Sequence, residues 1–287
     1  GWVISAYLQE KNTVAAFSLV QRYPHYASDP QDEEHALFYA WLDTGQYQAA
    51  RRYVERETRS VPWTRYDFGS PAAQPNDRWL TGQSLKFNYL LATNALPEAE
   101  KLSYRLASTA PGNQGLQIDY AALLQARGLP RAAEQKLKRA ETLEPTNLEL
   151  EKQQAYVAMD LQEWRQMDLL ANNVIARAPA DRSARRLDRL RMVHHMSELR
   201  LKAGKGLHSD NPVSGSHDMN WDATLYGPPV ADNWRLFAGT RYAQGNFDEG
   251  KGISRHLLGG VEWRPRDLTL EAELSGNHYH GKNRPGA

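Results

Sequence analysis

The chain has 287 residues, and its 35 Lys and Arg side chains nearly balance its 34 Asp and Glu side chains. Balanced charge gives no global reason to expect nucleic acid as a partner. The sequence contains no cysteine, which excludes disulfides, cysteine-ligated zinc and thiol nucleophiles. No apolar run reaches the roughly 18 residues that a bilayer-spanning helix needs, so the sequence predicts no such helix.

The first two thirds of the chain carry a repeat. Pro111, Pro145 and Pro179 lie 34 residues apart, which is the period of the tetratricopeptide repeat, a pair of helices that packs against its neighbours. Gly45 and Gly128 stand where the turn between the two helices of a repeat falls. Asn94 takes this place in another repeat, because asparagine tolerates a left-handed backbone. The pattern therefore predicts a helical solenoid.

One spacing is longer than the others. Pro62 and Pro111 are 49 residues apart, which exceeds one repeat by 15 residues. The excess falls in residues 64–79, TRYDFGSPAAQPNDRW, a segment rich in proline and turn-forming residues. Such a composition favours a loop over a helix. We expect an inserted loop between two repeats.

Solenoids commonly bind ligands on the concave face that the first helix of each repeat lines. Aromatic rings beside carboxylates and amides suit a sugar polymer or a basic peptide, because rings stack on apolar faces and carboxylates accept from hydroxyl or ammonium groups. An ordinary solvated helix face is the alternative. Counting in phase with the repeat places eight such residues on this face: Asp32, His35, Tyr39, Asp43, Asn88, Glu149, Tyr156 and Asp160.

The helical pattern ends within residues 183–206. The first part, SARRLDRLRMVHHM, is typical of a last helix, led by Asp181 and with Leu187 and Met192 among its apolar positions. A solenoid needs such a helix, because its terminal repeat would otherwise leave apolar surface uncovered. We therefore expect this helix to cap the solenoid.

After residue 197, apolar and polar residues alternate, which predicts β-strands. We expect five strands of roughly ten residues, the length that a tilted strand needs to cross a bilayer. They are residues 198–206, 217–226, 233–243, 253–264 and 267–277. The predicted fold class is α + β in two parts: a tetratricopeptide solenoid with its capping helix over residues 1–196, and the first strands of an antiparallel outer-membrane β-barrel over residues 197–287.

One face of these strands is apolar or aromatic, and the other is largely polar. A soluble sheet with one wet side shows the same alternation, but two features favour a membrane barrel. Trp221, Trp234, Trp263 and Tyr226 stand near the expected strand ends, as aromatic residues at membrane interfaces do. Longer polar connections at residues 206–218 and 244–252 alternate with short ones, as outside loops alternate with periplasmic turns in outer-membrane barrels.

Charged residues on the polar face are candidates for the wall of a pore. Glu271 and Glu273 share one side of a strand and could do acid–base chemistry, but a polar lumen that tunes which polymer passes is the favoured interpretation. Arg235 and Arg241 could instead pair with these two acids across strands as a structural feature. The predicted lumen-lining residues are Asp222, Arg235, Arg241, Glu262, Glu271 and Glu273.

The sequence predicts no catalytic, metal-binding or cofactor-binding group. His194 and His195 are adjacent, so they face different ways on a helix and make a poor metal pair. His278 and His280 share one side of a strand or loop and could hold a metal, although such pairs are more often incidental. The glycine-rich segments lack the signature of a phosphate-binding loop.

Five strands cannot close a barrel, because an open edge in lipid leaves backbone groups unpaired. The last residues, GNHYHGKNRPGA, resemble a further outside loop. The first residues, GWVISAYL, lack the features of a signal peptide. We therefore expect this sequence to be a piece of a longer chain that supplies further repeats and the remaining strands.

Two segments carry a resemblance to a known family. They are PADRSARRLDRLRMVHHMSELRL at the join and DMNWDATLYGPPVADNWRLFAGTRYAQGNFDEG in the first strands. Both resemble the poly-β-1,6-N-acetyl-D-glucosamine export porins of Gram-negative bacteria, a family of outer-membrane exopolysaccharide exporters with tetratricopeptide repeats. The resemblance covers the whole chain as late repeats followed by first strands.

The resemblance implies transport rather than catalysis. It implies a periplasmic solenoid that binds the partly de-N-acetylated polymer and docks the periplasmic polysaccharide deacetylase. It also implies an outer-membrane barrel, surrounded by lipid, that passes the polymer to the cell surface for biofilm formation. Because deacetylation exposes amines, carboxylates along the path would attract the cationic polymer without binding it tightly at any one point.

Two alternatives stay open. A cellulose-type exporter of the same layout would carry a neutral polymer and would need more aromatic and fewer acidic residues along its path. A tetratricopeptide adaptor would use the solenoid to bind protein partners, and its strands would form a soluble sheet.

Overall fold

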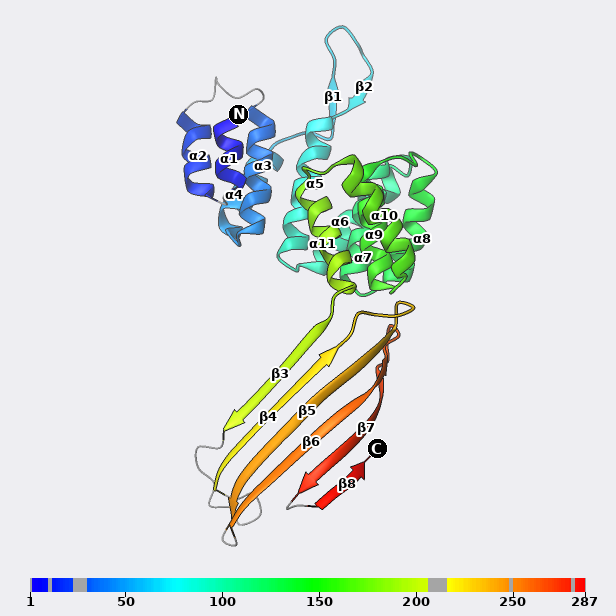
Figure 1. Cartoon of the computed structure of the whole chain (residues 1–287). Coiled ribbons are helices and arrows are strands. Elements are labelled where there is room, and N and C mark those ends of the chain that lie inside the picture. The colour runs from blue at the N-terminus through cyan, green and yellow to red at the C-terminus, as the bar shows by residue number, and fades with distance from the viewer. Residues whose placement is uncertain are drawn as a thin grey trace. The chain divides into compact units, whose positions relative to one another are not determined.

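The structure is a computed structural model that describes residues 2–9, 12–22, 30–205, 216–247, 250–279 and 282–286. The chain divides into two compact units, residues 1–144 and residues 145–287, whose helices and strands are labelled in Figure 1. The predicted domain boundary after residue 196 follows the change from helix to strand between His194 and Glu198. The compact units instead divide within the helical part, after Glu144.

In the first unit, helices dominate the described residues, and each helix packs against the next. They are α1 (Trp2–Gln9), α2 (Thr13–Arg22), α3 (Pro30–Asp43), α4 (Tyr47–Thr58), α5 (Asp77–Ala92), α6 (Leu96–Thr109), α7 (Gln114–Ala126) and α8 (Pro130–Glu141). The second unit begins with α9 (Leu148–Asp160), α10 (Trp164–Arg177) and α11 (Arg182–His194). None of the described helices is long and apolar enough to cross a membrane.

The turns within the repeats have the expected left-handed backbone. Gly45 and Gly128 adopt φ angles of 75° and 74°. Asn94 adopts 58°, which confirms that asparagine can replace the turn glycine. Gln162, 34 residues after Gly128, adopts 55°, so the turn geometry persists where the sequence gives no glycine or asparagine.

Helix starts recur at the same period. The side chains of Asn113, Asn147 and Asp181, which are 34 residues apart, accept hydrogen bonds from first-turn backbone N–H groups of α7, α9 and α11. Each cap satisfies a donor that has no partner within its own helix. The prolines two residues before the caps end the preceding segments, because proline cannot continue a helix.

The second helix of each repeat contributes a fully buried side chain at the same phase. Ala99, Ala133 and Met167 are all 0% exposed, so a small residue allows close packing in two repeats and a flexible thioether fills the space in the third. In α11, Leu187 is 0% exposed, whereas Met192 is 44% exposed. The assignment of Met192 to the apolar side of the capping helix was therefore wrong.

The inserted segment is more ordered than expected. Within residues 64–79, β1 (Thr64–Tyr66) and β2 (Ala73–Pro75) pair as an antiparallel hairpin, and α5 begins directly afterwards. The rings of Trp63 and Trp79 meet edge to face with centroids 5.1 Å apart. The loop prediction was wrong here, because the composition marks the turn but not the short ladder on each side of it.

The described strands of the second unit form one antiparallel sheet in the order β3-β4-β5-β6-β7-β8. They are β3 (Glu198–Lys205), β4 (Ser216–Tyr226), β5 (Trp234–Phe247), β6 (Gly250–Trp263), β7 (Leu270–Tyr279) and β8 (Lys282–Gly286). Each strand pairs with the next along the chain. The first five correspond to the predicted strands.

Two connections differ from the prediction. Residues 244–252 were expected to form a long loop, but β5 continues to Phe247 and β6 starts at Gly250. The last residues were expected to form a loop, but β8 pairs with β7 there. Backbone ladder bonds extend both hairpins where the side chains are polar, so composition alone could not reveal them. The long connection predicted at residues 206–218 mostly lies outside the described residues.

The tryptophans border the apolar band, and two of them stand at strand ends as predicted, because Trp234 begins β5 and Trp263 ends β6. Trp234 and Trp263 stack at one edge with ring centroids 5.9 Å apart. Trp221 and Tyr242 stack at the other edge, also at 5.9 Å, and Trp221 lies mid-strand instead of near an end. From Trp234 to Tyr242 the strand spans about 26 Å, or about 20 Å of height at a tilt of about 40°. That is close to the apolar band of about 25 Å in outer-membrane barrels.

The cap of α11 generates a prediction. Asp181 accepts hydrogen bonds from the backbone of Ser183 and Ala184 and lies 3.2 Å from Lys152 Nζ. Burial opposes its ionisation, but these bonds outweigh burial and lower the pKa of Asp181 to about 2. We expect Asp181→Ala to lower the free energy of unfolding by about 1–2 kcal/mol at pH 7, measured by thermal unfolding followed by circular dichroism.

The pH dependence of unfolding separates two contributions of Asp181, its negative charge and its capping hydrogen bonds. Because the pKa is lower in the folded state, the charge stabilises the fold above the unfolded pKa, and this contribution disappears as pH falls from about 4 towards about 2. Asp181→Asn retains a capping oxygen, so its deficit should shrink over that pH window. A deficit that stays constant over the same window would contradict the role of the charge.

Candidate functional site

The six predicted lumen residues all lie on one face of the sheet. Side chains alternate across a strand, and the ladder register sets Asp222 opposite Arg241, and Arg235 opposite Glu262. Glu262 in turn lies opposite Glu271. We call this surface, which also carries Glu273, the polar face.

The most buried group on the polar face is an ion-pair network. Arg235 Nε donates to Glu262 Oε1 at 2.7 Å, and Arg235 Nη1 donates to Glu198 Oε2 at 2.7 Å. The side chains of Arg235 and Glu262 are only 4% and 1% exposed. Charges buried to this degree persist only when they are paired. Arg235 thus pairs across strands, but with Glu262 and Glu198 rather than with Glu271 or Glu273 as predicted.

Tyr226 also belongs to this network. The guanidinium groups of Arg235 and Arg200 each lie 4.5 Å from the centre of its ring, and its hydroxyl donates to Glu271 Oε1 at 3.1 Å. The ring accepts the positive charge on its face while its hydroxyl reaches an acid. The assignment of Tyr226 to a membrane interface was therefore wrong, because its side chain is buried on the polar face. Neither Tyr226 nor Glu198 was among the predicted lumen residues, because their contacts depend on the strand register.

A second, more open network lies farther along the strands. Arg241 donates to Asp222 Oδ2 at 3.0 Å and to Glu273 Oε2 at 3.0 Å. All three side chains are at least a quarter exposed, so each pair contributes little to stability. The carboxylates that were predicted to attract a cationic polymer are thus already balanced by arginines.

Gly260 makes room for aromatic side chains to pack together on the polar face. A Cβ at Gly260 would lie 2.1 Å from the Ala272 carbonyl oxygen and 2.6 Å from the Phe237 ring. Those distances leave no room for any side chain at this position. The missing side chain allows Phe237 to pack beside Tyr226, with ring centroids 5.3 Å apart, and both are buried.

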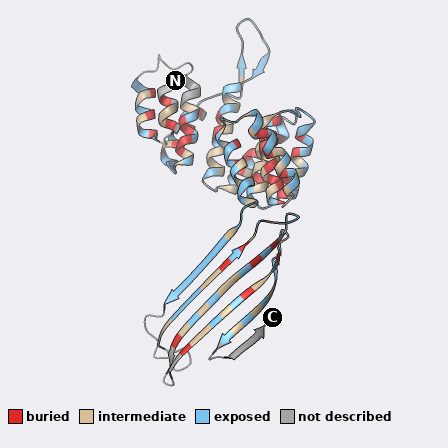
Figure 2. Cartoon of the chain, in the orientation of Figure 1, coloured by how far each residue is buried: buried red, intermediate tan, exposed pale blue. Residues whose placement is uncertain are grey.

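The opposite face of the sheet is apolar and exposed. Figure 2 shows that exposed residues occur in each strand from β3 to β7. Leu199, Leu201, Leu236, Leu257 and Leu274 are between 61% and 74% exposed. Exposed leucines at this density on one sheet face are unusual in a soluble domain. The sheet buries its ions and exposes its leucines.

The predicted solenoid residues are placed as follows in the first unit. Tyr39 is 45% exposed, and its hydroxyl lies 3.4 Å from Asn88 Nδ2 on α5, so α3 and α5 bring these two together. Asp43 is exposed at the end of α3. His35 is instead partly buried against Tyr53, with ring centroids 6.2 Å apart. The side chain of Asp32 lies outside the described residues.

In the second unit, the three predicted residues of α9 share one helix face. Glu149 and Asp160 are exposed, and Tyr156 is half-buried. Glu149 lies 2.5 Å from Lys152 Nζ. Burial works against the charge of Lys152, but the carboxylates of Glu149 and Asp181 outweigh burial and hold the pKa of Lys152 above its ordinary value.

One acidic residue was missed. Asp119 on α7 is half-buried, makes no ion pair with the part of the chain that the structure describes, and burial raises its pKa to about 7. Gly115 and Ala122 precede Glu149 and Tyr156 by 34 residues, so Asp119 falls between two positions of the predicted face. Applying the 34-residue period to this repeat would have identified Asp119 from the sequence.

Among the residues that the structure covers, no group of three potential metal ligands occurs. The His194 ring stacks on Trp164 at a centroid distance of 3.5 Å, and burial lowers the pKa of His194 to about 4. His195 Nε2 lies 3.2 Å from the Asp168 carboxylate. His280 lies outside the described residues, so its pairing with His278 is untested.

The sheet is an antiparallel meander with an exposed apolar face and an ion-paired polar face, and helical repeats precede it in the chain. These features define a membrane β-barrel segment that follows a helical-repeat segment. Residues 193–287 match the family model described as the PgaA membrane beta barrel domain. The similarity extends beyond this domain, because curated relatives match the chain over its full length.

Two of these relatives are the poly-beta-1,6-N-acetyl-D-glucosamine export proteins of Escherichia coli K12 and Escherichia coli O157:H7. Each is 44% identical to this chain over 291 aligned residues, which cover 100% of this chain and 36% of the relative. The chain therefore spans about a third of the length of these relatives.

Two solved structures overlap with parts of the chain. A chain described as a bacterial polysaccharide outer membrane secretin is 40% identical over 32% of this chain and 30% of its own length, with a TM-score of 0.29. A thermophilic TPR protein of Thermus thermophilus is 16% identical over 67% of this chain and 96% of its own, with a TM-score of 0.47. Neither overlap is close enough to bear on the fold.

The buried ion pair generates a prediction. Arg235→Ala would leave the carboxylate of Glu262, which is 1% exposed, without its partner. We expect a loss of about 3–5 kcal/mol in the free energy of unfolding of the full-length protein in detergent. Arg241→Ala is the matched control, since Arg241 is 46% exposed and its loss should cost less than about 1 kcal/mol. Equal costs for the two variants would contradict this account of the network.

Asp119 generates a second prediction. Its pKa is higher in the folded state than in the unfolded state, so its charge destabilises the fold, fully above about pH 7 and not at all below about pH 4. We expect Asp119→Asn to raise the free energy of unfolding by about 1–2 kcal/mol at pH 8 and to have no effect near pH 4. Thermal unfolding at the two pH values measures this, and an equal gain at both would contradict it.

Proposed function

We propose that this chain is part of an outer-membrane exporter of partly de-N-acetylated poly-β-1,6-N-acetyl-D-glucosamine, which passes the polymer to the cell surface for biofilm formation. Its sheet contributes strands to a β-barrel pore, and its helical repeats bind the polymer in the periplasm and dock the periplasmic deacetylase. The role is transport, without catalysis. The similarity of the whole chain to the Escherichia coli export proteins supports this proposal.

The observation that carries the proposal is the inverted distribution of side chains in the sheet. A soluble sheet turns its leucines towards a core and its ions towards water. Here Leu236 is 64% exposed, and Arg235 beside it is 4% exposed. That arrangement suits an outer wall in lipid and a polar bore, and it disfavours the soluble adaptor.

The polar face suits passage rather than tight binding. Arg235 and Arg241 each contact two carboxylates, so a cationic polymer meets a wall of small net charge. An ammonium group on the polymer could exchange transiently with the exposed Arg241 for Asp222 or Glu273. Weak, repeated contacts of this kind allow a ligand both to enter and to leave.

Acidic residues on the repeats favour a polymer that carries amines over a cellulose-type neutral polymer. Glu149 and Asp160 are exposed on one face of α9 beside Tyr156, which offers an ammonium group carboxylates and a sugar ring an aromatic surface. Asp119 would add a carboxylate whose ionisation an approaching ammonium group would favour. We infer that these residues lie on the polymer's path.

This inference is testable on the full-length protein. We expect Glu149→Ala combined with Asp160→Ala to weaken binding of deacetylated β-1,6-glucosamine oligomers about three- to tenfold at low salt, and less at high salt because ions screen the attraction. Isothermal titration with deacetylated and fully acetylated oligomers measures both effects. Fully acetylated oligomers should bind more weakly and respond little to the substitutions.

Glu98→Ala combined with Glu144→Ala is the matched control, because it removes two exposed acids outside the predicted face. An unchanged affinity in the first double variant, or an equal loss in the control, would remove the α9 face from the path. Equal binding of acetylated and deacetylated oligomers by the parent protein would favour the cellulose-type alternative.

A further inference from the structure

The apolar face of the sheet carries a row of aromatic and basic side chains across four strands. The ladder sets Trp221 opposite Tyr242, Tyr242 opposite Arg255, and Arg255 opposite His278. Because side chains alternate along each strand, all four lie on the same side of the sheet as Leu257. The exposed apolar wall therefore ends in a stacked aromatic pair that is followed directly by two basic side chains.

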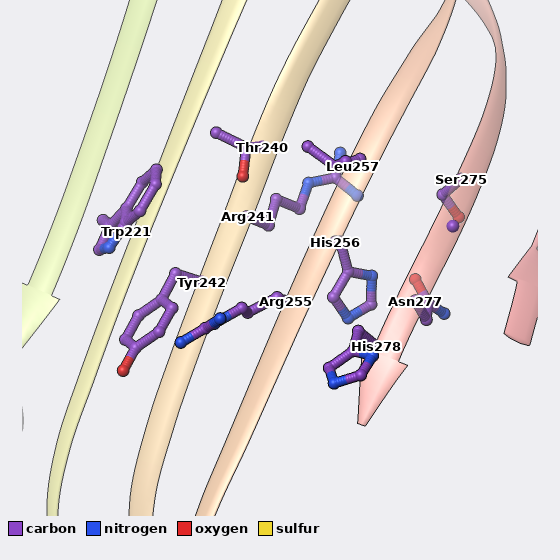
Figure 3. Close-up of a pocket in the computed structure, with 11 residues that line it drawn as sticks. Trp221, Thr240, Arg241, Tyr242, Arg255, His256, Leu257, Ser275, Asn277 and His278 are labelled. Atoms are coloured by element: carbon purple, nitrogen blue, oxygen red, sulfur yellow. The ribbon is translucent and has the colours of Figure 1, made fainter. Parts of the chain in front are cut away.

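A hollow of about 1010 Å³ lies beside this row, and Figure 3 shows the side chains around it. Leu257, which is 72% exposed, and Gly276 face each other in the ladder and border this space. A Cβ at Gly276 would meet nothing within 4 Å, so the missing side chain keeps this part of the hollow open. Side chains of the polar face also line the hollow, namely Arg241, His256, Ser275 and Asn277. Its border at Leu257 and Gly276 is therefore the part that suits a hydrocarbon chain.

The positive charge of Arg255, beside the hollow, has no acidic partner among the described residues. Arg255 is exposed and makes no hydrogen bond or ion pair with the part of the chain that the structure describes. The arginines of the polar face whose side chains the structure describes within the strands contact acids instead: Arg200 contacts Glu198, Arg235 contacts Glu198 and Glu262, and Arg241 contacts Asp222 and Glu273. An unpaired arginine at the rim of a lipid-facing wall therefore needs an anion from outside the chain.

The chemistry of the row identifies that anion. A guanidinium presents several N–H donors in a fork that matches phosphate oxygens. His278, directly opposite, adds another donor on the same face. Basic groups beside an apolar surface are the arrangement that binds the headgroups of anionic lipids, and the neighbouring rings of Trp221 and Tyr242 suit the interfacial depth at which headgroups lie.

We propose that Arg255 and His278 bind the phosphate of an anionic membrane lipid, whose acyl chain lies in the hollow beside Leu257 and Gly276. The proposal rests on the proposed function, because this face meets lipid only when the strands belong to a barrel. The row lies on the half of the sheet remote from Glu198, so the lipid belongs to the leaflet farther from the start of the first strand.

The test uses the full-length protein purified from outer membranes and measures lipid occupancy by native mass spectrometry. The probes are phosphatidylglycerol and phosphatidylcholine with the same acyl chains. We expect the parent protein to prefer phosphatidylglycerol, and Arg255→Gln combined with His278→Gln to lower phosphatidylglycerol occupancy about tenfold, because both basic groups that attract the anionic headgroup are removed. Gly276→Leu should lower the occupancy of both lipids, because it fills the hollow.

Arg266→Gln is the matched control, since Arg266 is an exposed arginine in the β6–β7 connection at the opposite end of the strands. It should leave lipid occupancy unchanged. Heat-modifiable mobility on gels confirms that each variant still forms a closed barrel. If the double variant loses that mobility, Gly276→Leu decides the matter, because it leaves both basic residues in place.

The outcomes separate this site from the proposed function. A parent protein absent from the outer membrane would overturn both proposals. A membrane-located protein whose double variant keeps phosphatidylglycerol occupancy within about twofold of the parent would overturn the lipid site alone. Displacement of the lipid by equimolar inorganic phosphate would also overturn it, because the site would then bind free anions.

Discussion

A slip of one residue in strand pairing would turn every side chain of a strand to the other face of the sheet. The register is therefore the constraint on which the rest of the second unit depends. In the observed register, Arg235 meets Glu262 and Leu236 meets Val261. A slip would place a guanidinium among exposed leucines and a leucine among buried carboxylates, and both changes would be costly. The ion pairs of one face and the apolar surface of the other are thus two consequences of one pairing.

This constraint also explains why charges are abundant on a face that is proposed to carry a charged polymer without retaining it. Arginines and acids on neighbouring strands balance each other, most fully at the buried pair Arg235–Glu262. The exposed trio around Arg241 keeps its ions exchangeable. A wall of this kind is polar everywhere and strongly attractive nowhere, which suits the movement of a long polymer better than a single tight site would.

The helical part follows a different rule, in which local chemistry repeats. The caps Asn113, Asn147 and Asp181 and the left-handed turns at Asn94, Gly128 and Gln162 recur at one period. Each depends on residues only a few positions away, so the sequence alone reveals most of them. Gln162 could not be anticipated, because its backbone is set by the packing of α9 against α10 rather than by its own preference.

Alternation allowed both faces of the sheet to be assigned from the sequence, since it needs only the period of a strand. The partners of each ion were not predictable, because the meeting of Arg235 with Glu198 and of Tyr226 with Glu271 depends on register and on the connections between strands. The extension of β5 to Phe247 was hidden for a related reason: backbone ladders form equally well beneath polar side chains. His35 was misplaced because a helix face predicted by phase does not show that a ring turns towards Tyr53.

The orientation of the two sheet faces is the central claim, and the absence of cysteine from the chain makes it directly measurable. Leu236→Cys and Glu273→Cys would each be introduced into a full-length protein free of other cysteines, labelled with a fluorophore and reconstituted in vesicles that contain brominated lipid. The account predicts that brominated lipid quenches the label at residue 236, whereas the label at residue 273 is quenched only by a water-soluble quencher. Lipid quenching at residue 273 together with aqueous quenching at residue 236 would contradict it.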